Sequence, residues 1–197
     1  MIFMTKNRIK EVTYKQLAEK GYDQATLSSI AKEVGIKTPS IYAFFKNKED
    51  LFMAVYKDLL EEYYLHIKRS IANLKNGSAK EKLYQIVKEL CNYYLSQPEK
   101  TAAYTKLAFY LPPTLNDKVK NIFNEMEEML FEVLGTIFSE GIEQGIIKDQ
   151  PVDDLIASFN CLMDGLFLEL LFYTEEKFRR RAEQVWNIYW NGIYKEH

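Results

Sequence analysis

The chain has 197 residues, of which 47% are hydrophobic and 27% charged, and its formal net charge is -2. This composition excludes a disordered or fibrous protein and is typical of one globular domain or two small ones. Residues 1–50 carry nine Lys/Arg and six Asp/Glu, whereas the rest of the chain carries 17 and 22. A basic head on an acidic body is compatible with a nucleic-acid partner for the first 50 residues.

The cysteines and the apolar runs indicate in which cellular compartment the protein is expected. Cys91 and Cys161 have neither the spacing of metal ligands nor that of a disulfide framework, so we expect reduced, buried or semi-buried thiols, no metal, no cofactor and a cytoplasmic protein. The start, MIFMTKNRIK, becomes charged too early for a signal peptide. The most apolar run, near 166–173, is interrupted by Glu169 and is far shorter than the roughly 20 residues needed to cross a bilayer.

The chain is predicted to be all-α with about nine helices, because apolar residues recur at helical spacing and nothing alternates with a period of two. The first helix is expected at 5–20, with Gly21 ending it. Two short helices follow within 25–51, and a long helix runs from Lys48 to the break at Asn76, Gly77 and Ser78. Further helices are expected at residues 79–96, 99–110, 115–144, 152–173 and 175–194.

The two short helices are predicted to form a helix-turn-helix. Thr26 can cap the first, whose apolar face is formed by Leu27, Ile30, Ala31 and Val34. Gly35 stands where a left-handed residue would end that helix. The second helix begins at Thr38 with Pro39 in its first turn, where the missing N–H is harmless. The second helix of such a pair can enter the major groove of DNA.

Polar residues on and beside the second helix strengthen this interpretation. The candidates for hydrogen bonds to phosphates or base edges are Lys37, Thr38, Ser40, Tyr42, Lys46 and Lys48. Lys48 lies in the first turn of the next helix, which Asn47 and Asp50 are expected to cap. A cation there opposes the helix dipole, so it favours a phosphate docked on the helix end. The alternative is a solvated surface lysine.

The run GYDQATLSSIAKEVGIKTPSIYAFFKNKEDLF resembles the DNA-binding domain of the TetR (tetracycline-repressor) family of bacterial transcription regulators. The resemblance covers about a quarter of the chain, and Phe44 departs from it because the family more often has histidine or tyrosine there. The residues that carry the resemblance are Gly21, Thr26, Ile30, Ala31, Gly35, Ile36, Ile41, Tyr42, Phe45, Lys48, Glu49 and Leu51. The resemblance implies a DNA-binding domain at 1–50 and a helical ligand-binding and dimerisation domain at 51–197.

The last two helices are predicted to form a homodimer. The helix at 152–173 is apolar on nearly all sides and would need more cover than one neighbour provides, and large aromatic residues on the last helix are common in interfaces. The expected interface residues are Phe159, Leu162, Leu166, Leu170, Trp186 and Tyr189. The resemblance implies the same four-helix bundle; the alternative is an ordinary monomer core.

A dimer would place two recognition helices about 34–36 Å apart, one turn of DNA, on a palindromic operator. In this hypothesis, Lys37, Thr38, Pro39 and Ser40 face bases. Thr26, Tyr42 and Lys48 hold phosphates.

The second half resembles the family's ligand-binding domain less specifically, through Gly141, Gly145, Asp164 and Gly165. The resemblance implies a repressor that a small hydrophobic or aromatic ligand releases from DNA, which requires different ligand affinities in two conformations. Candidate lining residues are Tyr93, Tyr94, Tyr104, Phe109, Tyr110, Phe123, Met126 and Met163. The alternative for each is plain core, which such residues at helical spacing form more often than a ligand cavity. The carboxylates among apolar residues, Glu89, Glu128 and Glu169, could face a cationic ligand, point to solvent or pair with a basic residue.

The sequence argues against an enzyme. His66 is most simply a solvated residue on a surface helix, and His197 is the terminal residue. No phosphate loop, nucleophile elbow or metal-ligand spacing is present, and adjacent acids such as Glu127 and Glu128 point apart on a helix. The remaining competitor is a helical interaction protein with a vestigial DNA motif, which would dimerise without specific DNA affinity.

Overall fold

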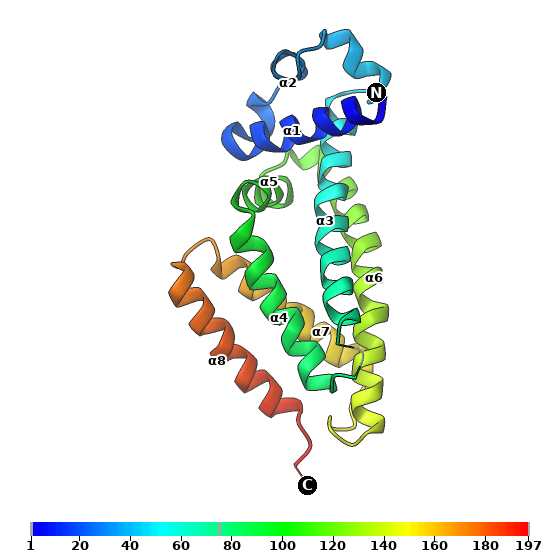
Figure 1. Ribbon diagram of the computed structural model, residues 1–197, viewed down its shortest axis with the longest axis vertical. Helices are drawn as coiled ribbons and strands as arrows, with labels where there is room; N and C mark the ends of the chain where they lie inside the picture. The colour runs from blue at the N-terminus through cyan, green and yellow to red at the C-terminus, as the bar shows by residue number, and fades with distance from the viewer. Residues whose placement is uncertain (1, 75, 197) are drawn as a thin grey trace. The chain divides into compact units, whose positions relative to one another are not determined.

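The computed structural model describes residues 2–74 and 76–196, except for the side chains of Ile2 and Phe3. The predicted all-α class is confirmed (Figure 1). The described elements are α1 (Ile2–Gln24), α2 (Leu27–Val34), the 3-10 helix η1 (Thr38–Ala43), α3 (Lys48–Ala72), α4 (Ala79–Ser96), α5 (Pro98–Phe109), the 3-10 helix η2 (Pro113–Leu115), α6 (Asn116–Glu143), α7 (Val152–Glu169) and α8 (Glu175–Ile193).

The chain folds into two compact units, the first formed by Met1–Tyr63 with Gln97–Met126 and the second by Tyr64–Ser96 with Glu127–His197. The helices α3 and α6 contribute residues to both units. The domain boundary expected after residue 50 stays a prediction; packing alone groups α5 and the start of α6 with the N-terminal helices. His197 lies outside the described residues.

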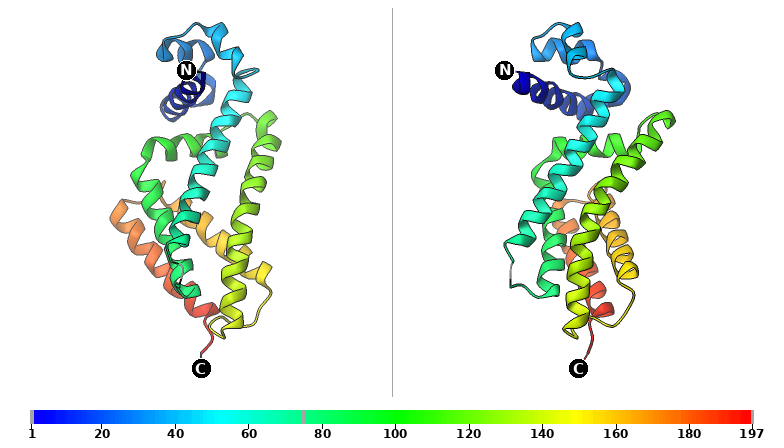
Figure 2. Two further views of the ribbon diagram at one scale, coloured as in Figure 1. Left: turned by 45° about the vertical axis from the view of Figure 1, so that its right-hand side comes forward. Right: turned by 90° about the vertical axis from the view of Figure 1, so that its right-hand side faces the viewer.

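The first unit is built around the buried faces of α1, α2 and α3. In both views of Figure 2, α2 and η1 lie over α1, and α5 packs against α1. The hydrophobic side chains between these helices are almost fully buried: Ile9, Val12, Leu17, Ile30, Ile41, Phe45, Leu51 and Phe52. In α1, for example, the buried residues Ile9, Val12, Thr13, Gln16 and Leu17 follow the i, i+3, i+4, i+7, i+8 pattern of one inward helical face.

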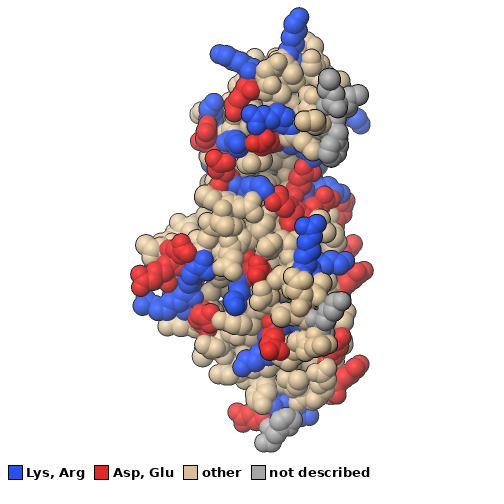
Figure 3. All heavy atoms as spheres, in the orientation of Figure 1, with Lys and Arg blue, Asp and Glu red and all other residues tan. Residues whose placement is uncertain are grey.

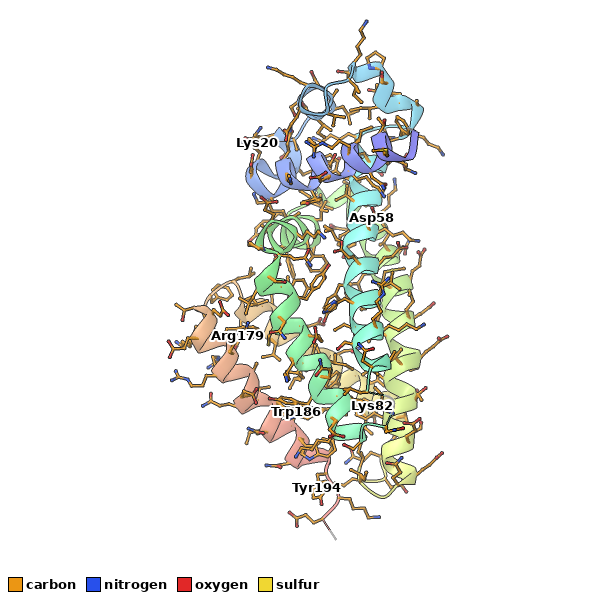
Figure 4. All side chains as sticks on the ribbon, in the orientation of Figure 1. Lys20, Asp58, Lys82, Arg179, Trp186 and Tyr194 are labelled. Atoms are coloured by element: carbon orange, nitrogen blue, oxygen red, sulfur yellow. The ribbon has the colours of Figure 1, made fainter. Side chains whose placement is uncertain are left out.

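The second unit is a helical bundle in which α4, α7 and α8 contact one another. Trp186 on α8 lies toward α4 (Figure 4), where its ring is stacked 5.4 Å from that of Tyr84. Phe138 of α6 and Phe159 of α7 meet edge to face at 6.2 Å between ring centroids. The β-bridge between Ile147 and Tyr194 fastens the end of the chain to the loop after α6.

Several helix limits differ from the sequence-based expectation. Although the bounds of α1 reach Gln24, two helical segments meet at a kink at Gly21, whose backbone is non-helical (φ 79°, ψ 176°), so the predicted interruption at Gly21 is confirmed. The second helix of the predicted pair is a 3-10 helix, whose tighter turn is common in short segments. Helix α7 ends at Glu169, because the bonds from Leu170, Leu171 and Phe172 reach back three residues instead of four. The apolar pattern continues beyond that point and therefore overestimates the helix length.

A glycine substitution tests the left-handed turn after α2. Gly35 has φ 82°, and an added Cβ would meet nothing within 4 Å, so Gly35→Ala changes the backbone preference alone. We expect it to lower the free energy of unfolding by about 1–2 kcal/mol. The matched control is Gly135→Ala in α6, where the new methyl group makes ordinary contact at 3.9 Å; we expect it to be stabilising by about 0.5–1 kcal/mol. Thermal unfolding followed by circular dichroism measures both, and equal melting temperatures would contradict the role given to Gly35.

Candidate nucleic-acid interface

Helix α2 is fixed at its start by a reciprocal cap. The Ser29 backbone N–H donates to Thr26 Oγ1 at 3.1 Å, and the Thr26 backbone N–H donates to Ser29 Oγ at 3.1 Å. This capping box satisfies two N–H groups that the first helical turn leaves without partners. The prediction that Thr26 caps α2 is confirmed.

A buried glutamine joins α2 to α1. Gln16 accepts a hydrogen bond from Ser29 Oγ at 2.6 Å and donates one to Glu33 Oε2 at 2.6 Å. Because Gln16 is buried and both bonds are part-buried, competition from water is limited. Gln16 was not among the residues predicted from the sequence. Its position was a usable signal, since Gln16 follows Ile9 and Val12 at helical spacing and therefore falls on the core face.

The turn between α2 and η1 is set by Gly35. Its N–H donates to the carbonyl oxygens of Ala31 at 3.0 Å and Lys32 at 3.2 Å, and the Ile36 N–H donates to Ala31 O at 3.0 Å. These bonds form the Schellman arrangement that ends a helix at a left-handed residue. The chain therefore leaves α2 in one defined direction, toward Lys37 and η1.

The 3-10 helix η1 turns a polar face outward because its apolar side is anchored. Ile41 and Phe45 are buried, and the N–H groups of Phe44 and Phe45 donate to Ile41 O at 2.9 and 3.0 Å. The side chain of Tyr42 is 56% exposed. Basic side chains project from the end of this unit that carries α2 and η1 (Figure 3).

Helix α3 begins with the predicted cap. The Asp50 N–H donates to Asn47 Oδ1 at 2.8 Å, and the Lys46 N–H donates to Asp50 Oδ2 at 2.8 Å. Lys48, in the same first turn, points back to α1. Its Nζ donates to Asp23 O at 3.3 Å and lies 4.3 Å from the centre of the Tyr22 ring. Partial burial there lowers the pKa of the Lys48 ammonium.

The predicted DNA-contacting residues therefore divide into two groups. One group lies together on the exposed or half-exposed side of the turn and η1, and consists of Lys37, Thr38, Pro39, Ser40, Tyr42 and Lys46. The other group, Thr26 and Lys48, already bonds within the protein through the α2 cap and the end of α1. The first group has the geometry of a surface that docks on a partner.

The predicted ligand-binding residues are distributed over both units. In the first unit, Tyr104 is stacked 5.7 Å from Tyr56, Met126 is buried and Phe123 is half-buried. Phe109 and Tyr110 lie on its surface, 55% and 73% exposed. In the second unit, Tyr93, Tyr94 and Met163 are buried.

The carboxylates that could have faced a ligand have other surroundings. Glu169 binds Arg181, which lowers the pKa of this carboxyl group. Glu89 lies 2.5 Å from His66 Nε2 and accepts from Gln85 at 2.7 Å, so the interpretation of His66 as simply solvated is wrong. Glu128 is exposed.

The predicted dimer residues belong partly to the core of the second unit. Phe159, Leu166 and Trp186 are buried within the chain itself, while Leu162, Leu170 and Tyr189 are half-buried. Cys91 is buried as expected, whereas Cys161 is exposed. Among the described residues, no group of His, Cys, Asp and Glu side chains could hold a metal ion, and none of the helices combines the length and hydropathy of a membrane span.

Residues 9–55 match the family model of bacterial regulatory proteins of the tetR family. The fatty acid metabolism regulator protein of Bacillus subtilis (strain 168) is 29% identical over 142 residues, which cover 72% of this chain and 70% of that protein. A TetR transcription regulator from Haloarcula marismortui has a TM-score of 0.81 at 21% identity, covering 97% of this chain and 98% of its own. The transcriptional regulator FadR from Bacillus subtilis, solved in complex with stearoyl-CoA, has a TM-score of 0.77 at 22% identity, covering 95% and 98%.

The matched residues 9–55 contain the capped helix α2, the left-handed turn and the outward face of η1. The structural likenesses extend over nearly the whole helical chain. The family is one of regulators rather than catalysts. The chain belongs to the TetR family and is a DNA-binding transcriptional regulator.

Proposed function

We propose that this chain is a repressor that binds a palindromic operator as a homodimer and is released by a small hydrophobic ligand. The observation that carries the proposal is the outward face of η1. Its donors lie beside a turn that Gly35 fixes and over a core that Ile41 and Phe45 anchor. A rigid support of this kind lets side chains reach base edges in one register.

Within that surface, the roles follow from position. Lys37, Thr38, Pro39 and Ser40 at the start of η1 face bases. Tyr42 and Lys46 bind phosphates on one side, and Thr26 and Lys48 bind phosphates near the starts of α2 and α3. The first turn of a helix favours an anion, because its N–H groups and dipole both point at it. On DNA, the ammonium group of Lys48 exchanges the Asp23 carbonyl for a phosphate oxygen.

Replacement of Lys48 tests the phosphate contact. We expect Lys48→Ala to weaken binding to all duplexes by a similar factor and to reduce the slope of log affinity against log salt by about 1. Fluorescence anisotropy at several salt concentrations measures both quantities. The control is Lys20→Ala, because Lys20 is exposed at the side of α1 away from η1 and forms no ion pair among residues 2–74 and 76–196 (Figure 4). An unchanged slope for Lys48→Ala would remove the phosphate contact from the proposal.

The dimer surface that the second unit offers is the exposed side of α7 and α8. On α7, Ala157, Cys161, Gly165 and Leu168 recur at intervals of three and four residues and are all exposed. On α8, Ile188 is 75% exposed. Small residues let two helices approach closely, and exposed Leu168 and Ile188 supply apolar area. This face replaces the buried Phe159, Leu166 and Trp186 in the proposed interface, and it forms a four-helix bundle with the same face of a second copy.

The cysteines of the chain allow a direct test of this face. Cys161 lies on the proposed interface, while burial raises the pKa of the Cys91 thiol to about 11 and makes it unreactive. A short bismaleimide is expected to link two copies through Cys161, giving a band at twice the mass of 23.2 kDa. The link should persist in Cys91→Ser and vanish in Cys161→Ser.

A charge at the same face should separate the copies. In sedimentation, Ile188→Glu is expected to give a monomer, whereas Leu65→Glu, at an exposed leucine of α3, stays dimeric. A monomeric wild-type chain would refute the dimer. A dimeric Ile188→Glu would refute the face.

Two of the comparisons support a long-chain acyl thioester as the ligand. One is named a fatty acid metabolism regulator, and the FadR structure contains stearoyl-CoA. In this chain, the buried aromatic pair Tyr93 and Tyr94, with Phe167 4.8 Å from Tyr94, forms an apolar part of the second unit suited to an acyl chain. Release requires that the ligand bind the DNA-free conformation more tightly than the DNA-bound one.

Selection of bound genomic fragments with the purified chain tests the regulator and supplies the operator. We expect recovery of duplexes with inverted half-sites whose centres are about 10 base pairs apart or a multiple of that. Stearoyl-CoA is then titrated into the complex and is expected to release the duplex, whereas free CoA, which lacks the acyl chain, is not. Absence of any preferred duplex would reject the repressor, while a preferred duplex that stearoyl-CoA leaves bound would reject this ligand class.

A further inference from the structure

The end of α1 controls how the chain enters the helix-turn-helix. Gly21 has φ 79° and ψ 176°, so the helix direction changes there. After the kink, the Ala25 N–H donates to Gly21 O at 3.2 Å, and Thr26 follows directly as the cap of α2. The geometry around Gly21 therefore sets the direction of α2 and, through the Gly35 turn, that of η1.

The carbonyl groups before such a kink need donors. The last four carbonyls of a helical segment have no partner within the helix, and the helix dipole makes that end negative. Ala18 lies in the last turn before Gly21. Lys106 Nζ donates to Ala18 O at 2.6 Å. A cation is the donor that this helix end favours, and the bond is part-buried, which limits competition from water.

Lys106 comes from α5, 88 residues further along the chain. Helix α5 packs against α1 within the first unit (Figure 1), and its Ala103 and Leu107 are fully buried. These apolar contacts hold the backbone of Lys106 in place, so its ammonium group reaches the Ala18 carbonyl from a fixed support. Lys106 is not part of the surface formed by the turn and η1, so that surface does not explain why a lysine stands at this position of α5.

We propose that Lys106 is a positioning residue for DNA binding: by holding the Ala18 carbonyl it fixes the kink at Gly21 and thereby the angle at which α2 and η1 meet DNA. Lys106 touches no phosphate. It acts through α1, and its loss lets α2 sample other directions. Specific recognition suffers, because base edges demand one register, whereas nonspecific phosphate attraction tolerates several.

Lys100 provides a matched control on the same helix. Its Nζ lies 2.5 Å from Glu62 Oε1 of α3, so it also joins α5 to another helix of the first unit. It contacts no carbonyl of the kink. Lys100→Met therefore removes one charge and one interhelical interaction without freeing the end of α1.

The experiment compares Lys106→Met, Lys106→Arg and Lys100→Met with the wild-type chain. The probes are the duplex recovered by genomic selection, which rests on the proposed function, and a scrambled duplex of the same length. We expect Lys106→Met to lose about tenfold in affinity for the selected duplex, with affinity for the scrambled duplex and the salt slope unchanged. Lys106→Arg, which keeps a cationic donor, should restore most of the loss, and Lys100→Met should stay within about twofold.

Hydrogen exchange without DNA separates this inference from the proposed function. In Lys106→Met, amides of residues 22–29 are expected to exchange faster than in Lys100→Met. If exchange there is unchanged, or if both duplexes lose affinity equally, the positioning role is overturned. If the wild-type chain prefers no duplex, the proposed operator is refuted. The hydrogen-exchange result then decides by itself whether Lys106 holds the end of α1. Should Lys106→Met not fold, Lys106→Gln takes its place, and the same outcomes decide.

Discussion

The outward face of η1 exists because the inward faces of three short segments share one small core. Ile30 of α2, Ile41 of η1 and Phe45 just after it are all buried. Once these side chains are inside, the polar residues between them point outward, since each residue of a 3-10 or α-helical turn is rotated by about 100–120° from the one before it and only residues three or four apart share a face. The row from Lys37 to Tyr42 is thus a consequence of apolar packing. The proposed DNA-contacting surface is the side of η1 that is not packed against the core.

Polar contacts then fix the angles between helices that the apolar core alone would leave variable. Gln16 ties α2 to α1, Lys106 holds the end of α1, and the Asn47–Asp50 cap starts α3. Each of these bonds is short-ranged and directional, so each restricts an angle that hydrophobic contact would leave variable. The DNA-binding part of the chain is therefore fixed at three points: the contact between α1 and α2, the end of α1 and the start of α3.

In the second unit, the apolar pattern of α7 predicted that the helix is buried but did not identify which residues face a second copy. A helix that is apolar on all sides must find cover, and the length of that apolar pattern led to a prediction of interface residues on α7 and α8. In the structure, Phe159, Leu166 and Trp186 are buried within the chain itself; Phe159 meets Phe138 of α6, and Trp186 stacks on Tyr84 of α4. What it leaves open is a different stripe of small and aliphatic residues, with Cys161 and Leu168 among them. The number of apolar residues shows that a helix must be buried, but it does not show whether helices of the same chain or a second copy bury it.

The sequence by itself determined the helical class, most helix limits after residue 47, the cap at Thr26 and the left-handed turn at Gly35. These features depend on residues within a few positions of one another, so local preferences decide them. Only the tertiary structure decided that Gln16 bonds to Ser29, that Lys48 lies over the Tyr22 ring and that Lys106 reaches Ala18, contacts that span 13 to 88 positions. The partner of a long polar side chain is set by where distant helices come together, and that arrangement follows from the packing of the whole core.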